Sequence, residues 1–256
     1  GESARPGALP PHSQSGGAVW WRVVPALLVS LALQVGVNYA NDYSDGIRGT
    51  DASQRPPARL VRAAGATGLV LAAVTTWWLL VVGAAAIASA WFYTGGPRPY
   101  GYAGLGELFV FVFFGLVATA GTGYVVAESV TSTMLVSGSA AGCFACALLV
   151  INNLRDIPGD TLAGKRTLAV RLGDRTTRGL FVSLFLAAGV LVVVSAALHG
   201  PAALTGLAGV AAAWPAIRAV RSGATGRTLV PVLGDVGRAQ LVFGVAYAAG
   251  LVMAAA

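Results

Sequence analysis

The chain has 256 residues, of which 56% are hydrophobic and only 11% are charged, whereas soluble proteins average about 25% charged residues. A mean hydropathy of +0.72 and 34 glycines exclude an ordinary soluble domain and indicate an integral membrane protein with close helix contacts. The net charge of +7 does not indicate nucleic-acid binding, because the basic residues lie in short loops between apolar segments, with no extended basic face.

Residues 1–17 contain three prolines and lack the apolar core of a signal peptide, so we expect a poorly ordered or incomplete N-terminal segment. After it, apolar runs alternate with polar loops, which predicts one membrane domain over 1–256 of the all-α class, a polytopic transmembrane helical bundle. The run over 63–93 exceeds the roughly 20 residues needed to cross a bilayer, and Thr75 and Thr76 predict a turn inside it. The other predicted spans begin near Val19 or cover 107–127, 133–151, 180–198, 202–217 and 229–256.

The first apolar run ends in a polar cluster. At about 100° per residue, its four oxygen-bearing side chains fall within roughly a 100° arc of one helix face; they are Asn38, Asn41, Asp42 and Asp45. Ionisable groups at the end of a hydrophobic segment are costly unless they face protein, water or a cation. A helix cap would account for Ser44 and Asp45, but not for four converging side chains.

A second polar cluster follows the run over 133–151. Its members are Asn152, Asn153, Arg155, Asp156 and Asp160. We interpret the two clusters as halves of one site. Pro158 and Gly159 predict an interruption of this helix, so that Asp160 would come from a helix end.

The basic residues predict the orientation. Fifteen of the 17 Lys and Arg residues lie in the alternate loops 46–62, 94–102, 155–178 and 218–238. The positive-inside rule puts these loops, and both clusters with them, on the cytoplasmic face. We therefore expect a multi-pass protein of the cell membrane whose active site opens at the cytoplasmic mouth of the bundle.

The chemistry of the clusters favours magnesium. Their carboxylates and carboxamides are hard oxygen donors, with no thiolate or imidazole among them, and Mg²⁺ commonly shares its coordination with phosphate oxygens. The adjacent cations would complement a diphosphate, although each also fits a positive-inside loop charge; they are Arg48, Arg155, Lys165 and Arg166. A diphosphate site that opens into lipid predicts an amphiphile with a long apolar tail. Cys143 and Cys146 lie within an apolar run, so we expect two small buried side chains.

Two stretches, 41–45 and 156–160, resemble the two aspartate-rich motifs of the UbiA superfamily of intramembrane prenyltransferases. The resemblance implies about nine helices, Mg²⁺, a polyprenyl diphosphate donor and an aromatic acceptor. It gives the metal and diphosphate role to Asp42, Asp45, Asp156 and Asp160. The superfamily's third aspartate of the first motif is replaced by Gly49, with Asp51 two positions later.

Longer stretches, 38–51, 93–114 and 152–174, resemble the branch of the family that prenylates 1,4-dihydroxy-2-naphthoate in menaquinone synthesis, particularly its actinobacterial type. This resemblance implies prenyl transfer with decarboxylation to demethylmenaquinone. Tyr93, Tyr100 and Glu107 lie in the middle stretch and are candidates to border the acceptor ring.

Two other functions fit the residues alone. The acceptor of a related prenyltransferase could be 4-hydroxybenzoate, a chlorin or a haem. From a different class, an ion-coupled transporter would also carry intramembrane carboxylates. Such a carrier usually shows internal repeats and midplane sites, whereas these acids lie at span ends beside Arg and Lys.

Overall fold

The computed structural model describes residues 19–29 and 58–255. Every regular element within these ranges is helical. Five helical spans are long and apolar enough to cross a membrane, and three further apolar helices are shorter. These observations confirm the predicted fold class, an all-α transmembrane bundle. The residues of the first polar cluster, Asn38, Asn41, Asp42, Asp45 and Arg48, lie outside the described ranges.

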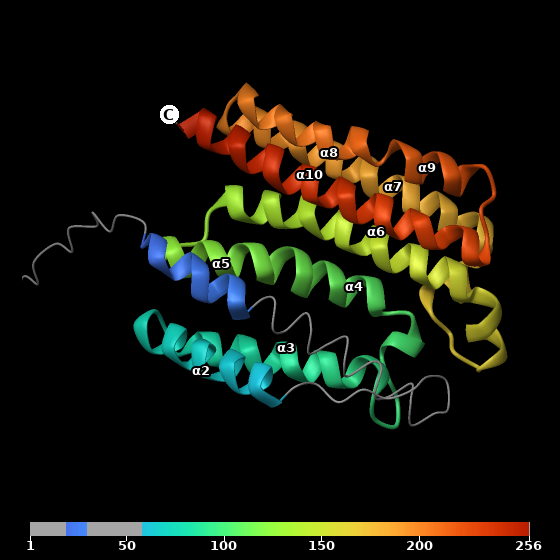
Figure 1. Cartoon of the computed structure of the whole chain (residues 1–256), viewed down its shortest axis with the longest axis horizontal. Coiled ribbons are helices and arrows are strands. Elements are labelled where there is room, and N and C mark those ends of the chain that lie inside the picture. The colour runs from blue at the N-terminus through green and yellow to red at the C-terminus, as the bar shows by residue number, and fades with distance from the viewer. Residues whose placement is uncertain (1–18, 30–57, 256) are drawn as a thin grey trace, which may run out of the picture.

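The three shorter apolar helices of the described residues lie along one side of the bundle in Figure 1. Helix η1 (Trp20–Arg22) leads into a helix that runs to Val29. Helices α2 (Ala58–Val74) and α3 (Trp78–Thr94) form an antiparallel pair. The turn predicted at Thr75 and Thr76 is confirmed, because the apolar run divides between Val74 and Trp78.

The next span is one continuous helix whose middle turns are π-helical. It consists of α4 (Gly106–Val110), a π-helical segment η3 (Phe111–Val117) and α5 (Ala118–Ala127). The π-segment packs closely against α6 (Ser132–Leu162): a Cβ placed on Gly115 would lie 2.5 Å from the Gly142 Cα. Glycine at both positions allows the two backbones to touch, as is common between membrane helices.

Helix α6 differs from the prediction at its polar end. It continues through Pro158 to Leu162, so Asp160 follows Asp156 by one helical turn within the same helix. The predicted interruption at Pro158 and Gly159 is therefore wrong. Proline removes one backbone donor, and the helix nevertheless continues for one more turn, in which the Thr161 hydroxyl donates to the Ile157 carbonyl at 2.7 Å.

The C-terminal half completes the bundle around α6. Helix α7 (Leu168–His199) begins at the Thr167 cap and bends at Gly173, whose φ is +76°. It is followed by η4 (Pro201–Gly206), α8 (Leu207–Ala212), α9 (Trp214–Arg221), η5 (Gly226–Leu229) and α10 (Val230–Ala255).

The core lies between α6, α7 and α10. The Phe144 ring packs edge-on to Phe185 with centroids 5.4 Å apart and stacks on Phe243 at 4.8 Å. All three side chains are buried. One side of α6 is thus anchored in the core, which fixes the helix that carries the second polar cluster.

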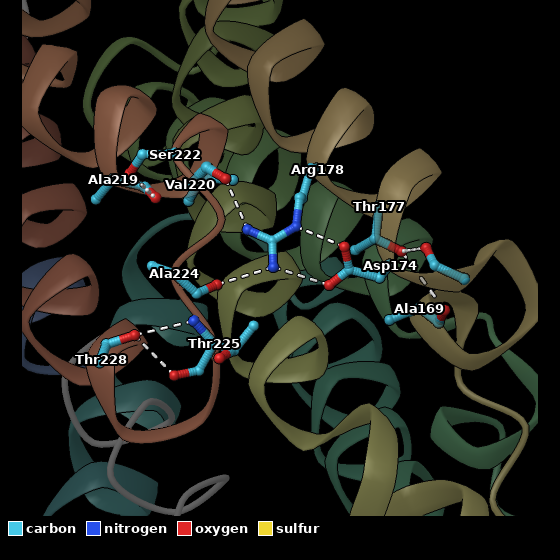
Figure 2. A network of polar contacts seen from close by, with 11 residues as sticks. Ala169, Asp174, Thr177, Arg178, Ala219, Val220, Ser222, Ala224, Thr225 and Thr228 are labelled. Atoms are coloured by element: carbon cyan, nitrogen blue, oxygen red, sulfur yellow. Dashed lines mark hydrogen bonds and ion pairs between the residues drawn. The ribbon is translucent and has the colours of Figure 1, made fainter.

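A partly buried arginine network joins the bend of α7 to the segment between α9 and η5 (Figure 2). Arg178 donates to Asp174 through Nε and Nη2, to the Val220 carbonyl through Nη1 at 2.6 Å and to the Ala224 carbonyl through Nη2 at 2.8 Å. These contacts hold the loop after α9 against α7. Arg178 belongs to the structure of this end of the bundle and not to the aspartate cluster.

Among the described residues, the loops that carry Arg or Lys lie at one end of the bundle in Figure 1, and the turns without basic residues lie at the other. The connections α3 to α4, α6 to α7 and α9 to η5 meet at one end, and the turns near Thr75, Ser129 and Gly200 lie at the other. Arg22 lies at this second end, but it is buried and pairs with Glu128. Its Nη atoms also bond the Val125 and Val74 carbonyls.

Candidate active site at the polar end of α6

Two of the four predicted metal ligands lie in the described part of the chain. Asp156 and Asp160 are one turn apart on α6, about 40° apart around its axis. The Asp156 side chain is 44% exposed and that of Asp160 is 12% exposed. Each carboxylate has a cation beside it.

Arg155 binds Asp156 in a two-bonded pair. Its Nε donates to Oδ1 and its Nη2 donates to Oδ2, both at 2.7 Å. Such planar pairs are among the stronger hydrogen-bonded contacts because both partners are charged. The predicted placement of Arg155 beside a motif carboxylate is therefore observed.

Lys165 lies beside the other carboxylate. Its Nζ is 3.5 Å from Asp160 Oδ1 and 4.8 Å from the centroid of the Tyr102 ring. The backbone N–H of Lys165 also donates to the Asp160 carbonyl at 2.9 Å. Lys165 is thus fixed to the end of α6 through both its backbone and its charge.

Arg166 is placed differently. Its side chain is exposed, and its backbone makes the local contacts: the N–H donates to the Tyr102 carbonyl at 3.0 Å, and the carbonyl accepts from Arg171 Nε at 3.0 Å. These bonds connect the loop before α7 to the segment between α3 and α4. The structure does not bring the Arg166 guanidinium to Asp156 or Asp160 through any contact among the described residues.

The two asparagines of the cluster are half-buried. Asn153 donates from Nδ2 to Glu107 Oε1 at 2.8 Å. Glu107 is 9% exposed, and its backbone carbonyl accepts from Cys146 Sγ at 3.1 Å. Both cysteines are free and buried, as predicted.

Aromatic side chains adjoin this contact. The Tyr93 and Tyr100 rings meet edge-on at 5.5 Å, and Tyr100 stacks on Phe109 at 4.0 Å. The Tyr100 hydroxyl donates to the Ser89 carbonyl at 2.8 Å, and burial raises the pKa of this phenol to about 12. Tyr100 therefore remains a neutral hydrogen-bond donor at physiological pH.

The donor set fits magnesium in its chemistry. Asp156 and Asp160 offer oxygen alone, and neighbouring positive charges suit a shared anionic ligand. No group of three or more possible metal-ligating side chains occurs within 19–29 and 58–255. The other two predicted carboxylates, Asp42 and Asp45, lie outside those ranges.

The comparison with known families is decisive. The model of the UbiA prenyltransferase family matches residues 12–229. The chain belongs to the UbiA prenyltransferase family. It is therefore a prenyltransferase, and the transporter alternative is not supported.

The chain is also similar to individual proteins of known name. The chain is 51% identical over 252 residues to a 1,4-dihydroxy-2-naphthoate octaprenyltransferase of Mycobacterium tuberculosis, which covers 91% of this chain and 86% of that protein. It is 34% identical to the Escherichia coli protein of the same name, over 72% of each chain. A 2-carboxy-1,4-naphthoquinone phytyltransferase of Synechocystis is 32% identical over 83 residues, or 32% of this chain and 27% of that protein.

The pairing of Glu107 with Asn153 was not predicted. Asn153 was expected in the second polar cluster and Glu107 at the border of the acceptor ring, and no pattern connected the two residues. The signal that links them is the packing of α4 against α6 across 46 positions of sequence, which no local pattern reveals.

Proposed function

We propose that the chain transfers a polyprenyl group from polyprenyl diphosphate to 1,4-dihydroxy-2-naphthoate, in a Mg²⁺-dependent reaction that releases CO₂ and gives the quinol form of demethylmenaquinone. The observation that carries the proposal is the turn of α6 on which Asp156 and Asp160 each pair with a cation. The names of the relatives, at up to 51% identity, support the naphthoate acceptor.

The donor's diphosphate would lie at the polar end of α6. Asp156 and Asp160, together with Asp42 and Asp45, are the residues to hold Mg²⁺. Bound Mg²⁺ would offset charge on the diphosphate oxygens and so make diphosphate a better leaving group. Arg155 and Lys165 keep the carboxylates oriented and add positive charge beside the anion. Asn38, Asn41, Asn152 and Arg48 complete the proposed set of substrate contacts.

The reaction then follows from the substrates. The bond between the allylic carbon and the diphosphate oxygen breaks, and its electrons leave with diphosphate. A ring carbon of the naphthoate forms the new carbon–carbon bond, and loss of the carboxyl group as CO₂ returns an electron pair to the ring. A site enclosed by apolar helices keeps water from the allylic cation.

The orientation of the protein is part of the same proposal. Loops rich in Arg and Lys gather at the end of the bundle that carries Asp156 and Asp160. By the positive-inside rule this end faces the cytoplasm. Both the diphosphate and the naphthoate would then reach the site from the cytoplasmic side of the cell membrane.

The test is an assay of the purified protein in lipid with labelled polyprenyl diphosphate, 1,4-dihydroxy-2-naphthoate and Mg²⁺. We expect a lipophilic labelled naphthoquinol that requires both substrates, disappears with EDTA and returns with added Mg²⁺. Parallel reactions with 4-hydroxybenzoate provide the acceptor control. Prenylation of 4-hydroxybenzoate but not of the naphthoate would overturn the proposed acceptor.

A further inference from the structure

Glu107 and Asn153 form a polar contact between α4 and α6, inside the bundle. Asn153 lies three residues before Asp156, which is roughly 4.5 Å toward the membrane interior at 1.5 Å per residue. Its Nδ2 donates to Glu107 Oε1 at 2.8 Å. The other oxygen, Glu107 Oε2, is buried without a hydrogen-bond partner among the described residues. In this part of the chain, the carboxylate is therefore bound through Asn153.

This contact fixes which end of the Asn153 amide faces Glu107. Because the NH₂ group donates to Glu107 Oε1, it turns toward α4 and the carbonyl oxygen Oδ1 turns away from it. Asn153, Asp156 and Asp160 fall within roughly a 60° arc of α6. On the face that carries the aspartates, Asn153 thus presents its carbonyl oxygen, which is a hydrogen-bond acceptor. An acceptor suits a hydroxyl group and does not suit a diphosphate anion.

The surroundings of Glu107 also suit an aromatic ligand. A Cβ placed on Gly106, the preceding residue, would lie 3.2 Å from Tyr93 Cε2. Tyr93 in turn meets Tyr100. An aromatic cluster therefore adjoins the residue before Glu107, and Asn153 lies inward of the charged turn, where the reacting carbons rather than the diphosphate would be.

We propose, on the basis of the function proposed above, that Glu107 is a positioning residue: it orients Asn153 so that Asn153 Oδ1 accepts a hydrogen bond from a ring hydroxyl of the aromatic acceptor. Asn153 contacts the substrate, and Glu107 acts through it. Asn153 thereby serves the acceptor, whereas Asp156 and Asp160 serve the donor.

A swap of the two side-chain types tests this arrangement. Glu107→Gln leaves the Asn153 amide free to rotate, and Asn153→Asp puts two carboxylates against each other. In the variant that carries both substitutions, the introduced amide donates to one oxygen of the introduced carboxylate, and the other oxygen of that carboxylate faces the site again. We expect each single variant to raise the KM of the naphthoate roughly tenfold, with little change in the KM of the donor. The double variant should return to within about threefold of the wild-type value.

Cys146→Ala is the matched control, because it removes a hydrogen bond to the Glu107 backbone carbonyl and leaves the carboxylate in place. It should leave both KM values unchanged. Thermal unfolding of every variant identifies loss of fold. A double variant that is as impaired as the worse single variant, or a rise in the donor's KM instead of the acceptor's, would overturn the positioning role.

Two acceptor analogues provide a readout that does not need turnover. Each of 1-hydroxy-2-naphthoate and 4-hydroxy-2-naphthoate keeps one of the two hydroxyls, and each is measured as a competitor of the acceptor. The analogue that keeps the contacted hydroxyl should inhibit Glu107→Gln roughly tenfold less well than the wild type, and the other should inhibit both proteins equally. Equal effects on the two analogues would overturn the hydroxyl contact even when wild-type prenyl transfer is intact.

Discussion

Arg155 and Asp156 are neighbours in sequence and partners in structure. The guanidinium binds both carboxylate oxygens at 2.7 Å. Both side chains are half-buried. A carboxylate held in this way keeps one orientation, and the cation beside it favours an anionic substrate at the same place.

Replacement of Arg155 by Gln should therefore weaken donor binding. We expect kcat/KM for the polyprenyl diphosphate to fall roughly tenfold or more, because charge-assisted contacts are stronger than neutral ones, with a smaller effect on the KM of the naphthoate. Steady-state kinetics with each substrate varied in turn measures this. Arg238→Gln removes an exposed arginine paired with Asp235 and serves as the control. A rise in the KM of the naphthoate alone would show that Arg155 serves the acceptor and not the donor.

The arginine network of α7 predicts a loss of stability. Arg178→Gln removes a charged donor from two backbone carbonyls and from Asp174. We expect destabilisation of roughly 2–4 kcal/mol, since hydrogen bonds to charged groups contribute about 1.5–3 kcal/mol each and unpaired carbonyls add a penalty. Thermal unfolding of the purified variant measures it. An unchanged transition would mean that the loop after α9 does not depend on this network.

Much of the fold could be predicted from hydropathy, because bilayer-spanning helices need long apolar runs. The turn at Thr75 and Thr76 was visible as two polar residues inside a run too long for one span. The passage of α6 through Pro158 was not, because the usual cost of a helical proline does not reveal which neighbouring groups compensate for it.

The site was predictable only in part. Asp156, Asp160 and their neighbouring cations share one short stretch, so their proximity followed from their closeness in sequence, although the helical turn between the two aspartates was not predicted. The contact between Glu107 and Asn153 depends on the close approach of two helices and leaves no local pattern. The first polar cluster, from Asn38 to Asp45, stays a prediction.

Tyr100 predicts a dependence of stability on high pH. Burial raises its pKa from 10.0 to about 12, so the folded protein keeps the phenol proton that the unfolded chain loses. This contribution to stability is fully present below pH 10 and is lost as the pH rises toward 12. Unfolding measured from pH 8 to 12 should show a decline that is smaller in Tyr100→Phe. An identical decline of stability in both proteins would show that groups other than Tyr100 cause the pH dependence.

The orientation can be tested by labelling. Ala163 is exposed at the end of α6, and Ser129 is exposed at the opposite end of the bundle. In Ala163→Cys, an impermeant thiol reagent should label inside-out vesicles and not intact cells; Ser129→Cys should show the reverse. Cys143 and Cys146 are buried and should contribute little background. Labelling of Ala163→Cys in intact cells would reverse the proposed topology.

We propose that the carboxylates of α6 form the donor site for prenyl transfer, and the variant Asp156→Asn probes this assignment at a single residue. The substitution removes charge with little change in volume, so the protein should stay folded while prenyl transfer falls at least roughly 100-fold and the Mg²⁺ requirement rises. Asp235→Asn, which changes an aspartate of α10 that pairs with Arg238, should retain activity. We expect a folded Asp156→Asn protein with little prenyl transfer to 1,4-dihydroxy-2-naphthoate; turnover near the wild-type level in that variant would show that Asp156 is not part of the donor site.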